Sequence, residues 1–158
     1  MAEITSYKHH LAQVNVAKMR GPLDSPVMAG FVAQLDEINA LADAAPGFVW
    51  RLQSGGDATS LRIFPDDTIL INMSVWESVE ALFEYTYKSD HVKVMRRRAE
   101  WFERMETAHT VLWWTPAGHI PTPDEAKARL DHLEQHGPNP HAFTFRQRFT
   151  VADLVGRP

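Results

Sequence analysis

Polar side chains that can bind and orient a small molecule recur with a period of two along the segment 69–77 (ILINMSVWE). Asn72, Ser74 and Trp76 lie at alternate positions there, and a β-strand points alternate side chains to one face. Asn72 and Trp76 therefore project in the same direction, about 13 Å apart along the strand. An amide, a hydroxyl and an indole on one face favour a pocket for a polar aromatic ligand. The alternative is that they pair with one another or line a wet dimer interface.

The segment 10–18 carries a similar contrast, with Gln13 and Asn15 alternating with Val14 and Val16. A buried amide without a hydrogen-bond partner costs on the order of 1–3 kcal/mol, so these side chains must pair or meet a ligand. The candidate site on this predicted sheet consists of catalytic Asn72 and Trp76 with substrate-binding Gln13, Asn15 and Ser74.

Among the eight histidines, His91 and His109 are the best candidates for a site. His91 opens a predicted helix and His109 opens a predicted strand, and an imidazole in either place can act as a general base or ligate haem. We take His91 as a candidate catalytic residue; a hydrogen-bonded structural histidine is the alternative. His132 and His136 have the i, i+4 spacing that zinc can use, but no H-E-x-x-H motif accompanies them. An exposed helix face explains the pair more simply, and we predict no metal site.

Three further residues complete the candidate substrate-binding set: Arg96, Trp113 and Tyr87. A guanidinium suits an anionic or phenolate substrate, although the Arg96–Arg98 run also fits a solvated, charge-paired surface. Trp113 and Trp114 are adjacent in a predicted strand and must point to opposite faces. One is expected to meet the helices and the other the barrel interior or a partner subunit.

The elements that would position these residues follow the order strand, helix, strand, strand, helix, strand. This is the split βαβ pattern of a ferredoxin-like antiparallel sheet, an α+β fold. The predicted strands cover 10–18, 48–53, 69–77 and 109–115, and the predicted helices cover 27–45, 79–88 and 91–105. A long connection is expected over 54–67.

A further helix is predicted after the sheet. Thr122 and Glu125 form a capping-box pattern, and Gly137-Pro138 ends the helix near His136. The segment 141–151 is predicted to form a short edge strand or an arm across a partner subunit. We therefore expect one domain over 1–158, with its core at about 8–118 and the C-terminal helix and arm at 119–158.

Composition excludes several function classes. The 158 residues contain no cysteine, which removes disulfides, thiolate nucleophiles and cysteine-ligated metals. The net charge of −4 argues against nucleic-acid binding. No apolar run reaches membrane-spanning length and the N-terminus has no apolar signal sequence, so we expect a cytoplasmic protein without a membrane partner. Dinucleotide, P-loop and G-x-S-x-G motifs do not occur.

Four segments resemble a family of uncharacterised bacterial proteins: NMSVWESVEAL, YKSDHVKVMRRRAEWF, LWWTPAGHIPT and AFTFR. That family lies in the dimeric α/β-barrel superfamily, which also contains the antibiotic-biosynthesis monooxygenases, and the resemblance covers about residues 8–147. The superfamily's cofactor-free quinone-forming monooxygenases use an Asn followed four residues later by a Trp. Asn72 and Trp76 match that spacing, and Arg96 matches a pocket arginine on the following helix. Those enzymes also use a tyrosine soon after the Trp, whereas Tyr85 and Tyr87 fall late here.

The resemblance and the residues together predict an oxidoreductase that acts on an aromatic or polyketide-type phenol without a bound cofactor. The alternatives are an accessory protein that only binds a small aromatic molecule, a haem protein that uses His91 or His109, and a non-oxidative isomerase or cyclase. A homodimer is also expected, because an isolated ferredoxin-like sheet leaves one apolar face open to water.

Overall fold

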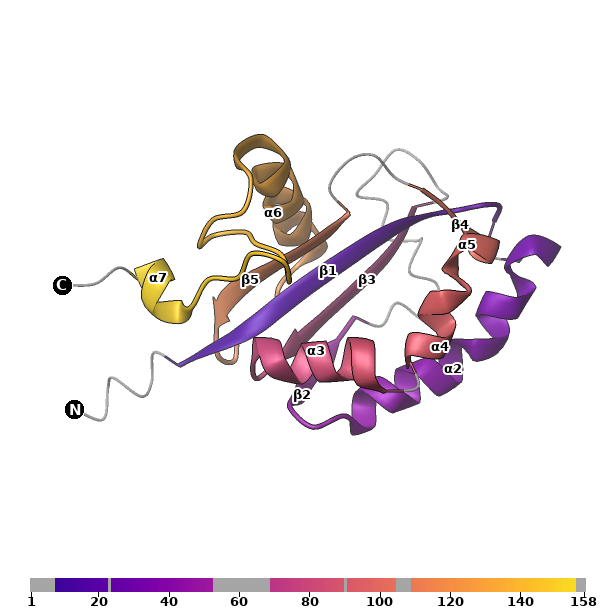
Figure 1. Cartoon of the computed structure of the whole chain (residues 1–158), viewed down its shortest axis with the longest axis horizontal. Coiled ribbons are helices and arrows are strands. Elements are labelled where there is room, and N and C mark those ends of the chain that lie inside the picture. The colour runs from indigo at the N-terminus through magenta and orange to yellow at the C-terminus, as the bar shows by residue number, and fades with distance from the viewer. Residues whose placement is uncertain (1–7, 23, 53–68, 90, 105–108, 156–158) are drawn as a thin grey trace.

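A curled antiparallel sheet with helices against both faces makes up the described part of the protein (Figure 1). The computed structural model describes residues 8–22, 24–52, 69–89, 91–104 and 109–155. The predicted connection over 54–67 lies outside these residues.

The long strand β1 (His9–Met19) runs through the middle of the sheet. It pairs antiparallel with β3 (Ile69–Trp76) on one side and with β5 (Thr110–Pro116) on the other. β2 (Phe48–Arg51) pairs with β3, and the two-residue β4 (Phe102–Glu103) pairs with the end of β1. This order confirms the predicted α+β, ferredoxin-like arrangement.

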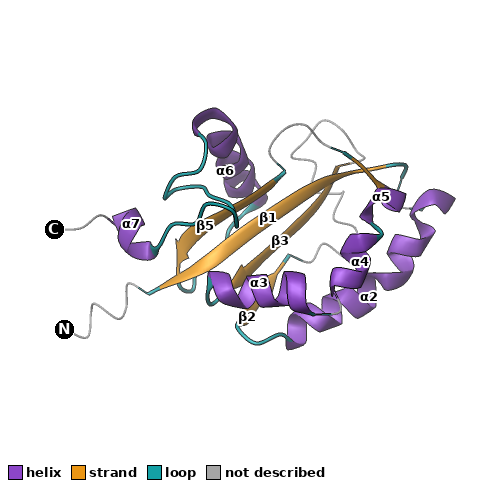
Figure 2. Cartoon of the chain, viewed as in Figure 1, coloured by secondary structure: helices purple, strands orange, loops and turns teal. Residues whose placement is uncertain are grey.

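Helices from both halves of the chain cover one side of the sheet (Figure 2). They are η1 (Pro26–Met28), α2 (Ala29–Ala44), α3 (Val79–Lys88), α4 (His91–Arg96) and α5 (Arg98–Trp101). The opposite side meets α6 (Pro123–His136), whose N-terminus has the predicted capping box between Thr122 and Glu125. We call the two sides of the sheet the α2–α3 face and the α6 face.

The middle of the α6 face is apolar. Ala12, Val14 and Val16 of β1 line up there with the odd-numbered residues of β3 and with Val111 and Trp113 of β5. Ala126, Leu130 and Leu133 of α6 join this cluster, in which each buried residue is at most 8% exposed within the single chain. The expectation that one sheet face lies open to water is therefore wrong, because this chain buries that face itself.

The α2–α3 face is different, because a polar strip divides its apolar residues into two clusters. Leu11, Trp76 and Leu112 pack against α3 at one end. At the other end, Met19 packs with Met28 and Trp101 from η1 and α5. The strip between the clusters consists of Gln13, Asn15, Asn72, Ser74 and Thr110, which lie side by side in the strand register.

The helix predicted over 91–105 is shorter and broken. It consists of α4 and α5 with a break at Arg97, and it ends at Trp101. Trp101 is 2% exposed and packs against Phe31, with ring centroids 5.6 Å apart. The next two residues pair with β1 as β4 instead of continuing the helix, so tertiary packing overrides the local helical pattern here.

The C-terminal arm lies on its own sheet. Phe143 is fully buried and exchanges both backbone hydrogen bonds with Leu112 of β5, at 2.8 and 2.9 Å. The arm then enters a short helix, α7 (Val151–Val155), which the sequence pattern did not predict. Residues 141–151 contribute only to the isolated bridges Leu112↔Phe143 and Asn139↔Ala142 in place of the predicted short edge strand, and the alternative of an arm across a partner subunit stays a prediction.

Within the described ranges, none of the helices has the length and apolar character needed to cross a membrane.

Candidate functional site

Three side chains of the polar strip form a hydrogen-bonded network with Trp76. Gln13 Nε2 donates to Asn72 Oδ1 at 2.9 Å and to Ser74 Oγ at 2.7 Å. Trp76 Nε1 also donates to Ser74 Oγ, at 2.8 Å. The network joins β1 to β3 across the Gln13↔Ser74 register pair, so the central strands of the sheet position all four residues.

Gln13 controls which way the Asn72 amide points. Because Gln13 donates to Asn72 Oδ1, the Nδ2 group of Asn72 must lie on the opposite side of that amide, away from Gln13. Asn72 has no other hydrogen-bond partner among the described residues, and its side chain is exposed. Gln13 itself is only 7% exposed. A buried amide thus holds an exposed one whose two N–H donors have no partner within the described ranges.

Asn15 lies next to Asn72 in the register but pairs in the other direction. Its Nδ2 donates to Thr110 Oγ1 of β5 at 2.7 Å. Thr110 was not among the predicted site residues, although its place opposite Asn15 follows directly from pairing the two strands. Asn15 therefore connects the polar residues of β1 and β3 to Thr110 of β5.

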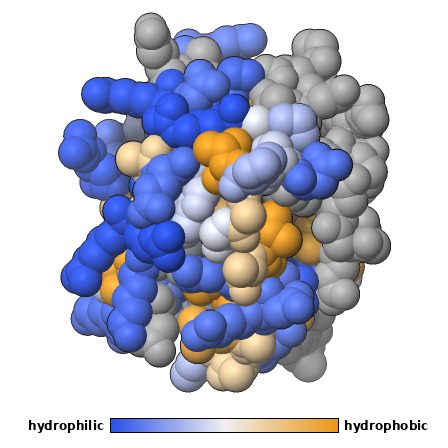
Figure 3. Space-filling view, turned by 90° about the vertical axis from the view of Figure 1, so that its right-hand side faces the viewer, coloured by the Kyte–Doolittle hydropathy of each residue, from blue (hydrophilic) through white to orange (hydrophobic). Residues whose placement is uncertain are grey.

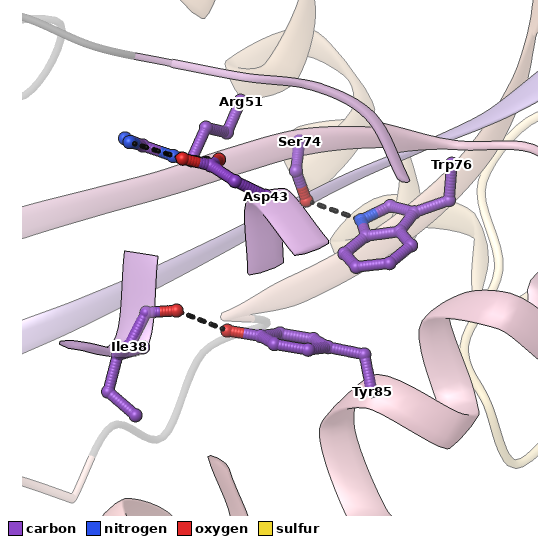
Figure 4. A network of polar contacts seen from close by, with 6 residues as sticks. All are labelled: Ile38, Asp43, Arg51, Ser74, Trp76 and Tyr85. Carbon is purple, nitrogen blue, oxygen red and sulfur yellow. Dashed lines mark hydrogen bonds and ion pairs between the residues drawn. The ribbon is translucent and has the colours of Figure 1, made fainter. Parts of the chain in front are cut away.

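A stack of rings extends from the network into the helix layer. Trp76 lies against Tyr85 of α3 with centroids 5.1 Å apart and an interplanar angle of 29°, and Tyr85 lies 4.9 Å from the ring of His91. Figure 4 shows the Trp76 indole directed at Ser74 and the Tyr85 hydroxyl directed at Ile38 of α2. The Tyr85 hydroxyl donates to the Ile38 carbonyl at 3.3 Å, so one side chain links α3 to α2.

Burial changes the acid–base properties of both ring partners. It raises the pKa of Tyr85 to about 12, with opposing smaller effects from Arg51 and Asp43. It lowers the pKa of His91, against a smaller upward effect of the hydrogen bond to Thr86. His91 Nδ1 lies 3.2 Å from the Thr86 carbonyl oxygen, which can only accept. A neutral His91 therefore carries its proton on Nδ1 and keeps a lone pair on Nε2.

The helix layer covers the middle of this face incompletely. The apolar stripe of α2, Phe31, Leu35, Ile38 and Leu41, is only half-buried, and Ala42 is the one buried residue of that helix. Asn72 is exposed although it lies on a strand next to the sheet's central strand. Asn72 thus presents an accessible amide in the polar strip, and the partly buried apolar stripe of α2 belongs to the helix layer on the same side of the sheet.

Three of the predicted substrate-binding residues lie elsewhere. Trp113 points to the α6 face, is 1% exposed and lies under the Arg129 guanidinium, because its position in β5 has the opposite parity to Leu112. Tyr87 is 43% exposed and contacts Phe83 and Phe145 near the arm. Tyr85, two residues earlier and three after buried Leu82, takes the place beside Trp76.

Arg96 is exposed at the end of α4, and no described contact brings it to the polar strip. Its neighbour Arg97 pairs with Glu100 at 2.9 Å and lies over Trp101. Figure 3 views the end of the molecule that carries α5 and the start of α2, where hydrophilic atoms surround a smaller hydrophobic area. The exposed, charge-paired interpretation of the Arg96–Arg98 run fits this surface better than a pocket.

Metal-ligating side chains do not converge at the strip. Within the described residues, no three histidine or acidic side chains lie where they could hold one metal ion. The predicted pair on α6, His132 and His136, has ring centroids 4.5 Å apart, and His132 Nε2 lies 3.3 Å from Asn139 Oδ1.

Several solved structures resemble this chain, among them the following three. SnoaB, a cofactor-independent oxygenase from Streptomyces nogalater, is 17% identical, with a TM-score of 0.47 over 72% of this chain and 98% of that one. NE2512, a protein of unknown function from Nitrosomonas europaea, is 12% identical, with a TM-score of 0.45 over 74% and 97%. A monooxygenase from the gene ActVA-Orf6 of Streptomyces coelicolor, in complex with nanaomycin D, is 16% identical, with a TM-score of 0.40 over 77% and 98%.

No curated protein matches the chain. A family model, however, matches residues 10–156, nearly the whole sequence and all of the elements described above. The chain therefore belongs to the family described as "Domain of unknown function (DUF3291)".

Proposed function

We propose that this protein is a cofactor-independent monooxygenase-like enzyme that oxidises a small phenolic aromatic molecule at the polar strip of the α2–α3 face. The observation that carries the proposal is the orientation of Asn72. A buried glutamine holds its oxygen, and the N–H groups of this exposed amide have no partner among the described residues. Donors fixed in this way stabilise an anion better than water does, because they need no reorganisation when the charge forms.

The chemistry requires a substrate that supplies all the electrons. An anthrone-like phenol loses a proton to give an electron-rich anion, and the anion attacks O₂ at carbon. The adduct then releases water and leaves a quinone. The substrate loses two hydrogens, one oxygen atom enters the product, and the other oxygen atom leaves as water with both hydrogens. No external reductant is needed, so a pocket of polar and apolar side chains is sufficient.

Each residue of the network has a separate role in this proposal. Asn72 donates to the substrate oxygen on which negative charge develops. Trp76 is 1% exposed and gives its N–H to Ser74, so it positions the network and does not contact the substrate through nitrogen. His91, neutral because burial lowers its pKa, is the candidate general base through Nε2.

The test is oxygen uptake with a panel of anthrones, naphthols and hydroquinones, combined with mass spectrometry of the products. We expect the wild-type protein, without added cofactor, to consume O₂ with at least one member of the panel. Asn72→Ala should lower kcat/KM about 100-fold or more, as expected for loss of a donor to a developing anion.

Gln147→Ala, an exposed amide on the C-terminal arm, is the matched control and should retain wild-type activity. Turnover by Asn72→Ala at the wild-type rate would refute the assignment of this site. Tight retention of an aromatic ligand without oxygen uptake would instead favour a binding protein.

A further inference from the structure

A cavity lies beside α3, and its lining includes no residue of the polar strip. It has a volume of about 380 Å³ and opens between the first turn of α3 and residues 148–151 of the C-terminal arm. Trp114 of β5 and Phe149 contribute its aromatic lining. We propose that this cavity is a binding site for a small aromatic zwitterion of the α-amino-acid type, separate from the site at Asn72.

Two opposite charges border the cavity without neutralising each other. Arg148 and Glu80 both line it, and neither forms an ion pair with the other or with another described side chain. A cation and an anion that line one cavity, neither of them ion-paired within the described part of the chain, match a ligand that carries both signs. A carboxylate can meet Arg148 while an ammonium group meets Glu80.

The arm holds Arg148 in place before any ligand binds. Its Nε donates to the Phe145 carbonyl at 3.0 Å, and its guanidinium lies 5.0 Å from the centroid of the Phe83 ring. These contacts leave the two terminal amino groups of the guanidinium available, in the planar geometry that binds a carboxylate with two hydrogen bonds. An arginine fixed in this way loses less conformational entropy on binding.

The aromatic lining accounts for the remaining part of the ligand. Trp114 uses its indole N–H to donate to the Phe149 carbonyl at 2.9 Å, so its ring presents an apolar surface and no unsatisfied donor. Val79 adds aliphatic surface from α3. The volume lies near the lower limit of small-molecule pockets, which suits a ligand with a single ring system.

The test uses three probes that share the tyrosine ring and differ in the charge of the α-amino and α-carboxyl groups: L-tyrosine, N-acetyl-L-tyrosine and L-tyrosine methyl ester. They are zwitterionic, anionic and cationic at pH 6, and binding to the full-length protein is measured at that pH by isothermal titration calorimetry or ligand-observed NMR. We expect L-tyrosine to bind most tightly. Each singly charged probe should bind about fivefold more weakly, the ratio that corresponds to about 1 kcal/mol for a partly exposed charge pair.

Two variants assign the charges. Arg148→Gln should weaken L-tyrosine and its N-acetyl derivative about fivefold without affecting the methyl ester, and Glu80→Gln should weaken L-tyrosine and the ester without affecting the N-acetyl derivative. Arg146→Gln and Glu84→Gln, which change exposed residues outside the cavity lining, are the matched controls and should bind all three probes like the wild type. Circular dichroism melts confirm that each variant is folded.

Equal affinity of the wild-type protein for the three probes would overturn the proposal, as would zwitterion binding that neither Arg148→Gln nor Glu80→Gln weakens. Loss of zwitterion binding in Asn72→Ala, with full binding in Arg148→Gln, would place the ligand at the polar strip and equally refute a second site.

Discussion

Replacing Gln13 with Glu should reverse the hydrogen-bonding polarity of the candidate site. The two side chains have nearly the same shape, but a carboxylate cannot donate the bonds that Gln13 Nε2 gives to Asn72 and Ser74. It can accept from Asn72 Nδ2 and from the Ser74 hydroxyl instead. The Asn72 amide then rotates by 180°, so that its oxygen occupies the exposed side where its N–H donors were.

The size of the effect follows from the bond that is lost. A hydrogen bond to a charged group contributes about 1.5–3 kcal/mol, which is about a 10- to 150-fold change in affinity for an anionic oxygen ligand. Gln13→Leu removes both donors without adding an acceptor, so Asn72 is free to rotate and the affinity should fall less. The expected order of affinity is wild type, then Gln13→Leu, then Gln13→Glu.

The assay is calorimetric titration with 4-nitrophenol at a pH where the phenol is ionised, in parallel with the ¹⁵N side-chain amide spectrum of Asn72. Gln13→Glu should shift the Asn72 resonances and weaken binding most. If Gln13→Glu binds the phenolate as tightly as the wild type, while a melt shows that it is folded, the argument from amide orientation is refuted.

Three other substitutions test the network and the ring stack. Ser74→Ala should destabilise the fold by about 2–4 kcal/mol in urea titrations, because the buried N–H groups of Trp76 and Gln13 lose their shared acceptor. Ser74→Thr keeps the hydroxyl and is the control. Equal losses of stability in both variants would contradict the role of the Ser74 hydroxyl as acceptor. Burial lowers the pKa of His91, so the folded state resists protonation and the free energy of unfolding falls as the pH drops through about 6.5. His91→Gln should therefore lose less stability than the wild type between pH 7 and 5. Equal losses of melting temperature in the two proteins over that range would contradict this. Burial raises the pKa of Tyr85 to about 12, so the free energy of unfolding of the wild type should fall by up to about 2–3 kcal/mol as the pH rises above about 10. Tyr85→Phe has no hydroxyl to ionise and should not show this loss. An equal loss at alkaline pH in that variant would contradict a buried Tyr85 hydroxyl.

The sheet and its polar strip were predictable because strand parity is a local property. Alternation along 10–18 and 69–77 placed Gln13, Asn15, Asn72 and Ser74 on one face, and the strand register confirms it. The same rule predicted that Trp113 and Trp114 point to opposite faces. It does not say which face meets which helices, and Trp113, a predicted substrate-binding residue, lies on the α6 face, away from the polar strip.

Features that depend on packing between distant segments were not predictable in the same way. The helix expected to reach residue 105 ends at Trp101, because that side chain is buried against Phe31, seventy positions earlier in the sequence. The C-terminal helix α6 packs against β5 and joins the buried cluster on its side of the sheet, and the homodimer stays a prediction. The position of Tyr85 was predictable, because Tyr85 lies three residues after Leu82 and shares its helix face, whereas Tyr87 lies five residues after Leu82 and does not.

The most direct test of the central claim is incorporation of ¹⁸O from ¹⁸O₂ into the product of a phenolic substrate identified by oxygen uptake. The account predicts one ¹⁸O atom per molecule of product with the wild-type protein and no added cofactor, and loss of that labelled product with Asn72→Ala. An unlabelled product from the wild type, or a labelled product formed equally well by Asn72→Ala, would contradict it.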